Sequence, residues 1–345
     1  MTAVQSPSVS SPALAVQRPC VALQMRSIDA LFLRALQVAA FQARVHSVFD
    51  RVINIECTTG DLFTLAAREF DNAPHTVIVE IAGFGATGIG VDDPVATIDG
   101  ALRVGDGLVL HVGAASIWQS TLPTYATAPG RMSEQLRAAR SYLVRQGVRS
   151  GMSVEGAADG AFALEIATAL EQRSALLLEA LAQARHADAC RHAVSMLGLG
   201  PGLTPSGDDF LVGLFATLNL AGSPCQGWLE GGTAVLRHAR HATHAISLAA
   251  LTAAAAGRVR ESIEALIESL LHGTPATLVQ PLRRVLAIGA TSGADLVAGI
   301  LAGLDLILRI EATGTVALPL QLRDSAELYR DSAAVAAAPC SSTGA

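Results

Sequence analysis

Lysine is absent from this sequence, and all 24 of its basic residues are arginine. This absence excludes a Schiff-base lysine and the lysine of a phosphate-binding P-loop. Any cationic contact to a phosphate or carboxylate must therefore come from arginine, whose planar guanidinium suits both anions. The formal net charge is −6 and the basic residues form no tract, so neither nucleic acid nor a charged membrane surface is an expected partner.

Cysteine is also scarce, with five residues at wide spacing and no Cys-x-x-Cys pair. This pattern disfavours a disulfide framework and a thiolate zinc site, and it fits a reducing cytoplasm. The N-terminus lacks the basic region and the continuous apolar run of a signal peptide. Residues 1–22 are instead rich in serine and proline, which predicts a disordered tail.

The mean hydropathy of +0.42 raises the question of a membrane span. The longest apolar segment, Val285–Leu304, contains Asp295 and a polar break, which would be costly inside a bilayer. The segment Phe210–Gly222 is too short to cross one. Both segments are therefore predicted to be buried core helices, with no membrane partner.

Short runs of apolar and β-branched residues, separated by tight turns, occupy the first third of the chain. Arg51–Cys57 and Asp61–Ala67, for example, flank a glycine turn, which is a hairpin signal. Five or six such strands predict a small antiparallel barrel or sandwich in a mainly β domain over residues 23–125. One helix, from Ser27 to about His46, is expected at its start.

The pattern is helical over residues 126–338, where alanine and leucine recur at three- and four-residue spacing. The sequence thus predicts an α+β fold, with a small antiparallel β barrel or sandwich followed by a larger all-helical domain. The expected helices cover 133–146, 161–196 (broken near 173 and 186), 206–221, 227–256, 258–271, 276–288, 293–311 and 323–336.

The segment Gly198–Asp209, which reads GLGPGLTPSGDD, has the composition of an anion-binding loop. Its alternating glycines permit positive φ and allow backbone N–H groups to turn inward. A loop of this kind that leads into a helix start presents free N–H groups and the helix dipole to a negative ligand. We expect unpaired main-chain donors between residues 198 and 207 to converge on a small anion. The candidate binding residues here are Gly200, Gly202, Thr204, Ser206 and Gly207.

Ser206 is predicted to cap this helix, with Asp209 as its partner in a capping box. Asp208 has no capping role in that arrangement, which makes it available for a ligand or a metal. Asp208 and Asp209 are the candidate catalytic residues.

A shorter copy of the motif occurs downstream, where SGADLVAG (292–299) aligns with SGDDFLVG (206–213). Two helices with the same start and the same later glycine can cross closely at Gly213 and Gly299. Their starts would then face one pocket. This adds Thr291, Ser292 and Asp295 to the candidate binding residues. The alternative is two purely structural helix caps, because Ser-x-x-Asp is a common helix start.

Three histidines follow at three-residue spacing in RHARHATH (237–244), and the first and last lie about two helical turns apart, which is unfavourable for a shared metal site. They are expected to form a polar helix face. Thr243 and Ser247 lie one turn apart and are predicted to offer hydroxyls to the anion pocket. No cofactor is predicted, and Mg²⁺ held by the aspartates is the alternative.

The run GLGPGLTPSGDDFLVGL resembles the signature of the AllH subunit family of oxamate carbamoyltransferase. The similarity extends to the β-rich front, to the segment from Thr243 to Glu261 and to Thr291–Gly299. It implies a cytoplasmic subunit of a multisubunit complex in purine and allantoin nitrogen catabolism. That complex interconverts oxalurate and phosphate with oxamate and carbamoyl phosphate, so small anionic substrates and other subunits are the implied partners.

Two other functions are compatible with the same residues. One is a stand-alone Mg²⁺-dependent hydrolase that uses Asp208, Asp209 and Asp295. The other is a non-catalytic regulatory or scaffold subunit that binds an anion. An aspartate beside an anion is unfavourable unless it binds Mg²⁺, contacts an amide N–H₂ group or serves as a cap.

Overall fold

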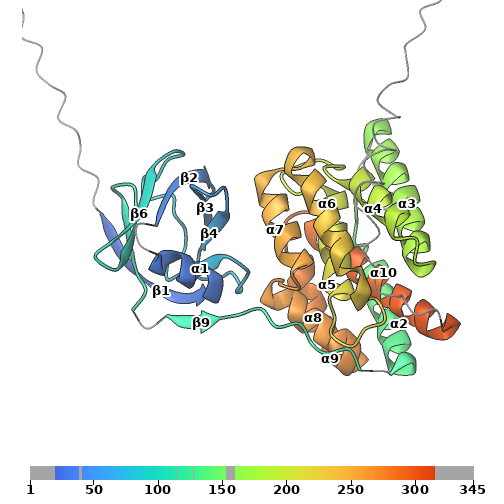
Figure 1. The fold of residues 1–345 in the computed structure, drawn as a ribbon. Helices are drawn as coiled ribbons and strands as arrows, with labels where there is room; N and C mark the ends of the chain where they lie inside the picture. The colour runs from blue at the N-terminus through green and yellow to red at the C-terminus, as the bar shows by residue number, and fades with distance from the viewer. Residues whose placement is uncertain (1–19, 39–40, 114, 127, 153–159, 315–345) are drawn as a thin grey trace, which may run out of the picture. The chain divides into compact units, whose positions relative to one another are not determined.

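The computed structural model describes residues 20–38, 41–113, 115–126, 128–152 and 160–314 (Figure 1). The chain divides into two compact units. Among the described residues, the first unit lies within 20–28, 32–70 and 77–116, and the second lies within 29–31, 71–76 and 117–314. Most of the predicted N-terminal tail and the helix predicted at 323–336 lie outside the described residues.

The first unit is a closed barrel. Its strands follow the order β5-β4-β3-β2-β6-β7-β8-β1, and pairing of β1 with β5 closes the ring. A further strand, β9 (Ser116–Trp118), lies beside β1. The barrel strands are β1 (Val21–Asp29), β2 (Gln42–Val48), β3 (Val52–Cys57), β4 (Leu62–Ala66), β5 (Thr76–Val79), β6 (Pro94–Ile98), β7 (Ala101–Val104) and β8 (Leu108–His111).

The prediction of an antiparallel barrel or sandwich was wrong, because the barrel is mixed. β1 pairs antiparallel with β5 but parallel with β8, where Val21 is opposite Leu108. The helix predicted from Ser27 to His46 is also shorter, since α1 covers only Ala30–Gln37 and lies between β1 and β2. The wrong helix prediction concealed β1, which closes the barrel, and β2, which follows α1.

Apolar side chains of α1 contribute to the barrel core. Phe32 is fully buried, and its ring stacks on Phe63 with the ring centroids 4.5 Å apart. Phe41 meets the same Phe63 ring edge-on at 5.8 Å. Leu36, one turn after Phe32, is buried in the same cluster. Burial of this aromatic group is the main apolar reason for α1 to pack against the strands.

The second unit is helical, with α5 and α10 as its central pair (Figure 1). Every residue of α5 is buried, and α10 is buried along most of its length, as predicted for core helices. No helix in the described residues is long and apolar enough to cross a membrane. The helices are α2 (Pro129–Arg145), α3 (Ala161–Ala182), α4 (His186–Met196), α5 (Ser206–Leu218), α6 (Leu229–Ala242), α7 (Ala245–Ala255), α8 (Glu261–His272), α9 (Pro275–Leu286) and α10 (Ser292–Thr313).

The close crossing of α5 and α10 predicted from the repeated motif is confirmed. A Cβ atom at Gly213 would lie 2.2 Å from the Leu296 carbonyl oxygen, and one at Gly299 would lie 2.0 Å from the Phe210 carbonyl oxygen. Both distances are far below van der Waals contact, so each glycine allows the backbone of the facing helix to approach. The crossing holds the starts of the two helices together.

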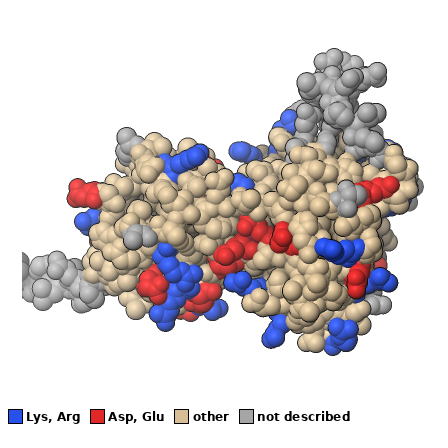
Figure 2. All heavy atoms as spheres, turned by 90° about the horizontal axis from the view of Figure 1, so that it is seen from below, with Lys and Arg blue, Asp and Glu red and all other residues tan. Residues whose placement is uncertain are grey.

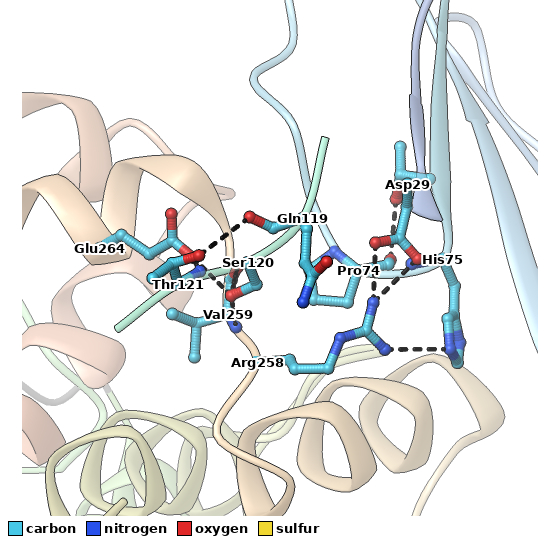
Figure 3. Close-up of polar contacts among 10 residues, drawn as sticks. Asp29, Pro74, His75, Gln119, Ser120, Thr121, Arg258, Val259 and Glu264 are labelled. Atoms are coloured by element: carbon cyan, nitrogen blue, oxygen red, sulfur yellow. Dashed lines mark hydrogen bonds and ion pairs between the residues drawn. The ribbon is translucent and has the colours of Figure 1, made fainter. Parts of the chain in front are cut away.

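A buried ion pair anchors residue 29 within the second unit (Figure 3). Asp29 is fully buried, and Nη2 of Arg258 lies 2.7 and 2.8 Å from its two carboxylate oxygens. The backbone N–H of His75 also donates to Oδ2 at 3.0 Å. Next to Arg258 in the chain, Val259 donates its N–H to the Ser120 hydroxyl oxygen at 2.9 Å.

We expect Arg258→Met to destabilise the protein by about 3–5 kcal/mol, because it leaves the Asp29 carboxylate buried without its cation. The measurement is the free energy of unfolding in urea. Arg140→Met is the matched control, since the Arg140–Asp305 pair is about half exposed and such pairs contribute about 0–1 kcal/mol. Equal losses in the two variants would contradict this prediction.

Charged side chains are dispersed over the face seen in Figure 2. Basic and acidic groups lie close to one another there, in small clusters among mostly uncharged residues. Several of the ion pairs are exposed surface contacts, such as Arg44 with Glu56 and Asp92.

Candidate functional site

The glycine-rich segment forms a loop between α4 and α5. Gly198, Gly200 and Gly202 all have positive φ, at 68°, 129° and 94°. Residues 201–203 are exposed, and the Leu203 side chain is 49% exposed at the tip. The centre of the loop is therefore open to solvent, while its last residues, from Pro205 onward, are buried.

Main-chain donors at the two ends of this loop are engaged, but those at its centre are not. The Gly198 N–H donates to Asp208 Oδ1 at 2.9 Å, and the Gly207 N–H donates to the Leu199 carbonyl at 3.0 Å. Five further N–H groups make no hydrogen bond to any described residue, namely those of Gly200, Gly202, Leu203, Thr204 and Ser206. The loop thus has fixed ends and a row of free donors between them.

Gly200 leaves space beside one of these donors, the N–H of Ser206. A Cβ atom at this position would lie 2.5 Å from the Ser206 nitrogen. Only glycine combines that close approach with a φ of 129°. Gly207, at the start of α5, instead has a packing role, because a Cβ there would lie 2.2 Å from the Met196 carbonyl oxygen.

Asp208 joins the loop to the junction between α6 and α7. Its side chain is 1% exposed, and Oδ2 accepts a hydrogen bond from the Thr243 hydroxyl while Oδ1 accepts from Gly198. Burial raises the pKa of Asp208, and hydrogen bonds from Thr243, Gly198 and Ser247 oppose that rise. Both carboxylate oxygens are therefore held by the protein itself.

Asp209 lies in the first turn of α5 and is 7% exposed. Burial raises its pKa to about 8, the Ser292 and Thr204 hydroxyls oppose the rise, and the Asp295 charge adds to it. Its Oδ2 atom has no hydrogen-bond partner among the residues that the structure describes. At neutral pH this carboxyl group is therefore mostly protonated, and it carries no charge that would repel an anion.

The predicted capping box was wrong. Pro205 is the N-cap of α5, and no side chain caps the helix. Ser206 is the first helical residue, and its hydroxyl instead lowers the pKa of Asp295 on α10. The α5 start is thus stabilised across the helix pair rather than within its own first turn.

Asp295 is fully buried at the start of α10. Its Oδ1 atom accepts hydrogen bonds from the Ser150 hydroxyl at 2.6 Å and from the Gly151 N–H at 2.9 Å, and burial raises its pKa. A Cβ at Gly151 would lie 2.2 Å from Ser206 Oγ. The sequence analysis missed Ser150 and Gly151, since no motif or spacing marks them.

The remaining candidate residues differ in how closely they join this group. Thr204 Oγ1 and Ser292 Oγ lie 2.8 Å apart, so the hydroxyls of the two helix starts meet directly. Ser247 is buried, and its hydroxyl faces the Leu203 carbonyl at 3.5 Å. Thr291 is the N-cap of α10, is exposed and makes no side-chain capping bond.

The histidine segment contains the α6–α7 junction. His238 and His241 are exposed on α6, and His244 is the N-cap of α7. Among the described residues, no group of three or more His, Cys, Asp or Glu side chains is placed to hold a metal ion.

The sequence matches two models of one protein family. The model described as oxamate carbamoyltransferase subunit AllH matches residues 196–304, and the AllH family N-terminal domain matches residues 24–117. Together they cover most of the chain. The chain belongs to the AllH family. No solved structure matches it. The AllH match contains the glycine loop and both helix starts, whereas Ser150 and Gly151 lie outside both matches.

Proposed function

We propose that this AllH chain binds the oxyanion substrates within a carbamoyltransferase complex. The reaction interconverts oxalurate and phosphate with oxamate and carbamoyl phosphate. The observation that carries the proposal is the row of loop N–H groups that make no hydrogen bond to any described residue, four of them on exposed or half-buried residues, inside the AllH match. All four reactants are small anions, which suit such a loop.

The loop and the acidic residues beneath it have complementary roles in this proposal. Backbone N–H groups from Gly200 to Ser206 bind phosphate and stabilise the charge that develops as the carbamoyl carbon is attacked. Asp208 fixes the loop through Gly198, and Asp209 stays neutral beneath the anion. Asp208 thus affects the reaction by fixing the position of the loop. Asp209 affects it by adding no negative charge beside the anion.

The family description as a subunit supports a further part of the proposal. We place the chain in a multisubunit complex of purine and allantoin nitrogen catabolism in the cytoplasm. The direct test is to purify the chain with and without its partner subunits and to assay phosphate-dependent breakdown of oxalurate. Absence of activity in every combination of subunits would contradict the proposed function.

The loop itself is tested by Gly200→Ala. The new Cβ would crowd the Ser206 N–H and strain a φ of 129°. We expect turnover by the complex to fall about 100-fold or more, the size of effect seen when one oxyanion donor is lost. Isothermal titration with phosphate should show a parallel loss of affinity.

Gly60→Ala is the matched control, because Gly60 has a φ of 85° with no atom within 4 Å of its Cβ position. It also places alanine at a positive φ, in the β3–β4 turn, but without a clash. If Gly200→Ala weakens phosphate binding but leaves turnover near that of Gly60→Ala, the chain binds the anion without taking part in the chemistry.

A further inference from the structure

His244 occupies the junction between α6 and α7, directly after Thr243. Its backbone is extended, at φ −77° and ψ 155°, and it is the N-cap of α7. The residue is exposed, whereas the three carboxylates Asp208, Asp209 and Asp295 are buried. Asp208 and Asp295 already accept hydrogen bonds from protein donors, whereas the exposed His244 is not enclosed by the core and can meet a ligand in the open loop.

The junction lies against the first residue of the glycine loop. A Cβ at Gly198 would be 2.1 Å from the Ala242 carbonyl oxygen and 3.9 Å from the Thr243 Cα. The Thr243 hydroxyl donates to Asp208, whose other oxygen accepts from Gly198. The backbone on the N-terminal side of His244 is therefore held at the loop by both packing and hydrogen bonds.

His244 and Asp208 also interact electrostatically. The charge of His244 lowers the pKa of Asp208 and so favours the carboxylate form. His244 is therefore close to a carboxyl group that is itself hydrogen-bonded to the loop at Gly198.

We propose that His244 donates the proton to the leaving nitrogen during carbamoyl transfer. This inference rests on the proposed function. A phosphate oxygen attacks the ureido carbonyl carbon of oxalurate, a C–O bond forms, and the C–N bond to the oxamate nitrogen breaks. The imidazolium proton passes to that nitrogen. The proton lost by hydrogen phosphate restores the imidazolium, so the products are oxamate and carbamoyl phosphate with no net change in charge.

The test is His244→Asn in the complete complex, assayed with saturating oxalurate and phosphate. Loss of a general acid is expected to lower kcat about 100-fold or more, with KM changed less than about threefold. Added imidazole should restore part of the rate, because it can replace the missing proton donor. His241→Asn, an exposed histidine one turn earlier, is the matched control and should keep wild-type kcat.

The outcomes distinguish failure of the proposed carbamoyltransferase function from failure of the role of His244. A wild-type complex without activity would contradict the proposed function, and with it the proposed role of His244. An active wild-type complex whose His244→Asn variant keeps kcat within about threefold would overturn the role of His244 alone. A large loss of kcat that imidazole does not restore would also overturn it, and would assign His244 to loop structure.

Discussion

Gly299→Ala is expected to unfold the helical unit or to lower its stability by about 3 kcal/mol or more. The added Cβ would lie 2.0 Å from the Phe210 carbonyl oxygen and 2.9 Å from the Leu214 nitrogen. Both are backbone atoms of α5, which cannot move aside as a flexible side chain can, so α5 and α10 must separate. Overpacking typically costs about 1–3 kcal/mol where side chains can adjust, and we expect this backbone clash to exceed that range.

The measurement is thermal and urea unfolding of the variant beside Gly130→Ala. Gly130 lies in α2 with no atom within 4 Å of its Cβ position, so alanine there should be neutral or slightly stabilising. The crossing also holds Thr204 beside Ser292. Any folded Gly299→Ala protein should therefore bind phosphate more weakly. A variant as stable as Gly130→Ala would contradict the close crossing.

The repeated Ser-Gly-x-Asp start shows what the sequence can predict about this site. The helix crossing and the meeting of the two starts follow from local features, namely a shared start and a glycine at the same later position. Five unpaired loop amides likewise agree with the glycine spacing. Ser150 and Gly151 reach Asp295 across 144 or more residues of sequence, and no local signal reports such a contact.

The barrel shows where sequence reasoning fails. Residues 27–46 contain leucine and alanine at helical spacing, which concealed β1 and β2. Closure of the barrel depends on the pairing of β1 with β5 and β8, which are both far along the chain. The parallel register of β1 with β8 is set by that tertiary arrangement. The protonation of Asp209 is similar, because it depends on burial by residues distant in sequence.

Asp209 makes the stability of the wild-type protein fall as pH rises from about 4 to about 8. Its pKa is about 8 in the folded chain and about 4 when unfolded. Between these values the native state holds one more proton than the unfolded state, so Asp209 contributes a loss of about 1.4 kcal/mol per pH unit. Asp209→Asn removes this contribution and should raise stability at pH 8 by several kcal/mol, as measured by urea unfolding across pH.

The same substitution should change how anion affinity depends on pH. An ionised Asp209 beneath the loop repels a bound anion, and two like charges a few ångströms apart in a protein interact by about 3 kcal/mol. With sulfate, whose own charge is constant, we expect wild-type affinity to fall about tenfold between pH 7 and pH 9, because only the protein with Asp209 protonated binds well, whereas Asp209→Asn stays within about threefold. Asp305→Asn, an exposed acid on the same helix as Asp295, should behave like the wild type. If the wild-type affinity for sulfate does not change across pH 8, sulfate binds too far from Asp209 for the ionised carboxylate to repel it, and the prediction is wrong.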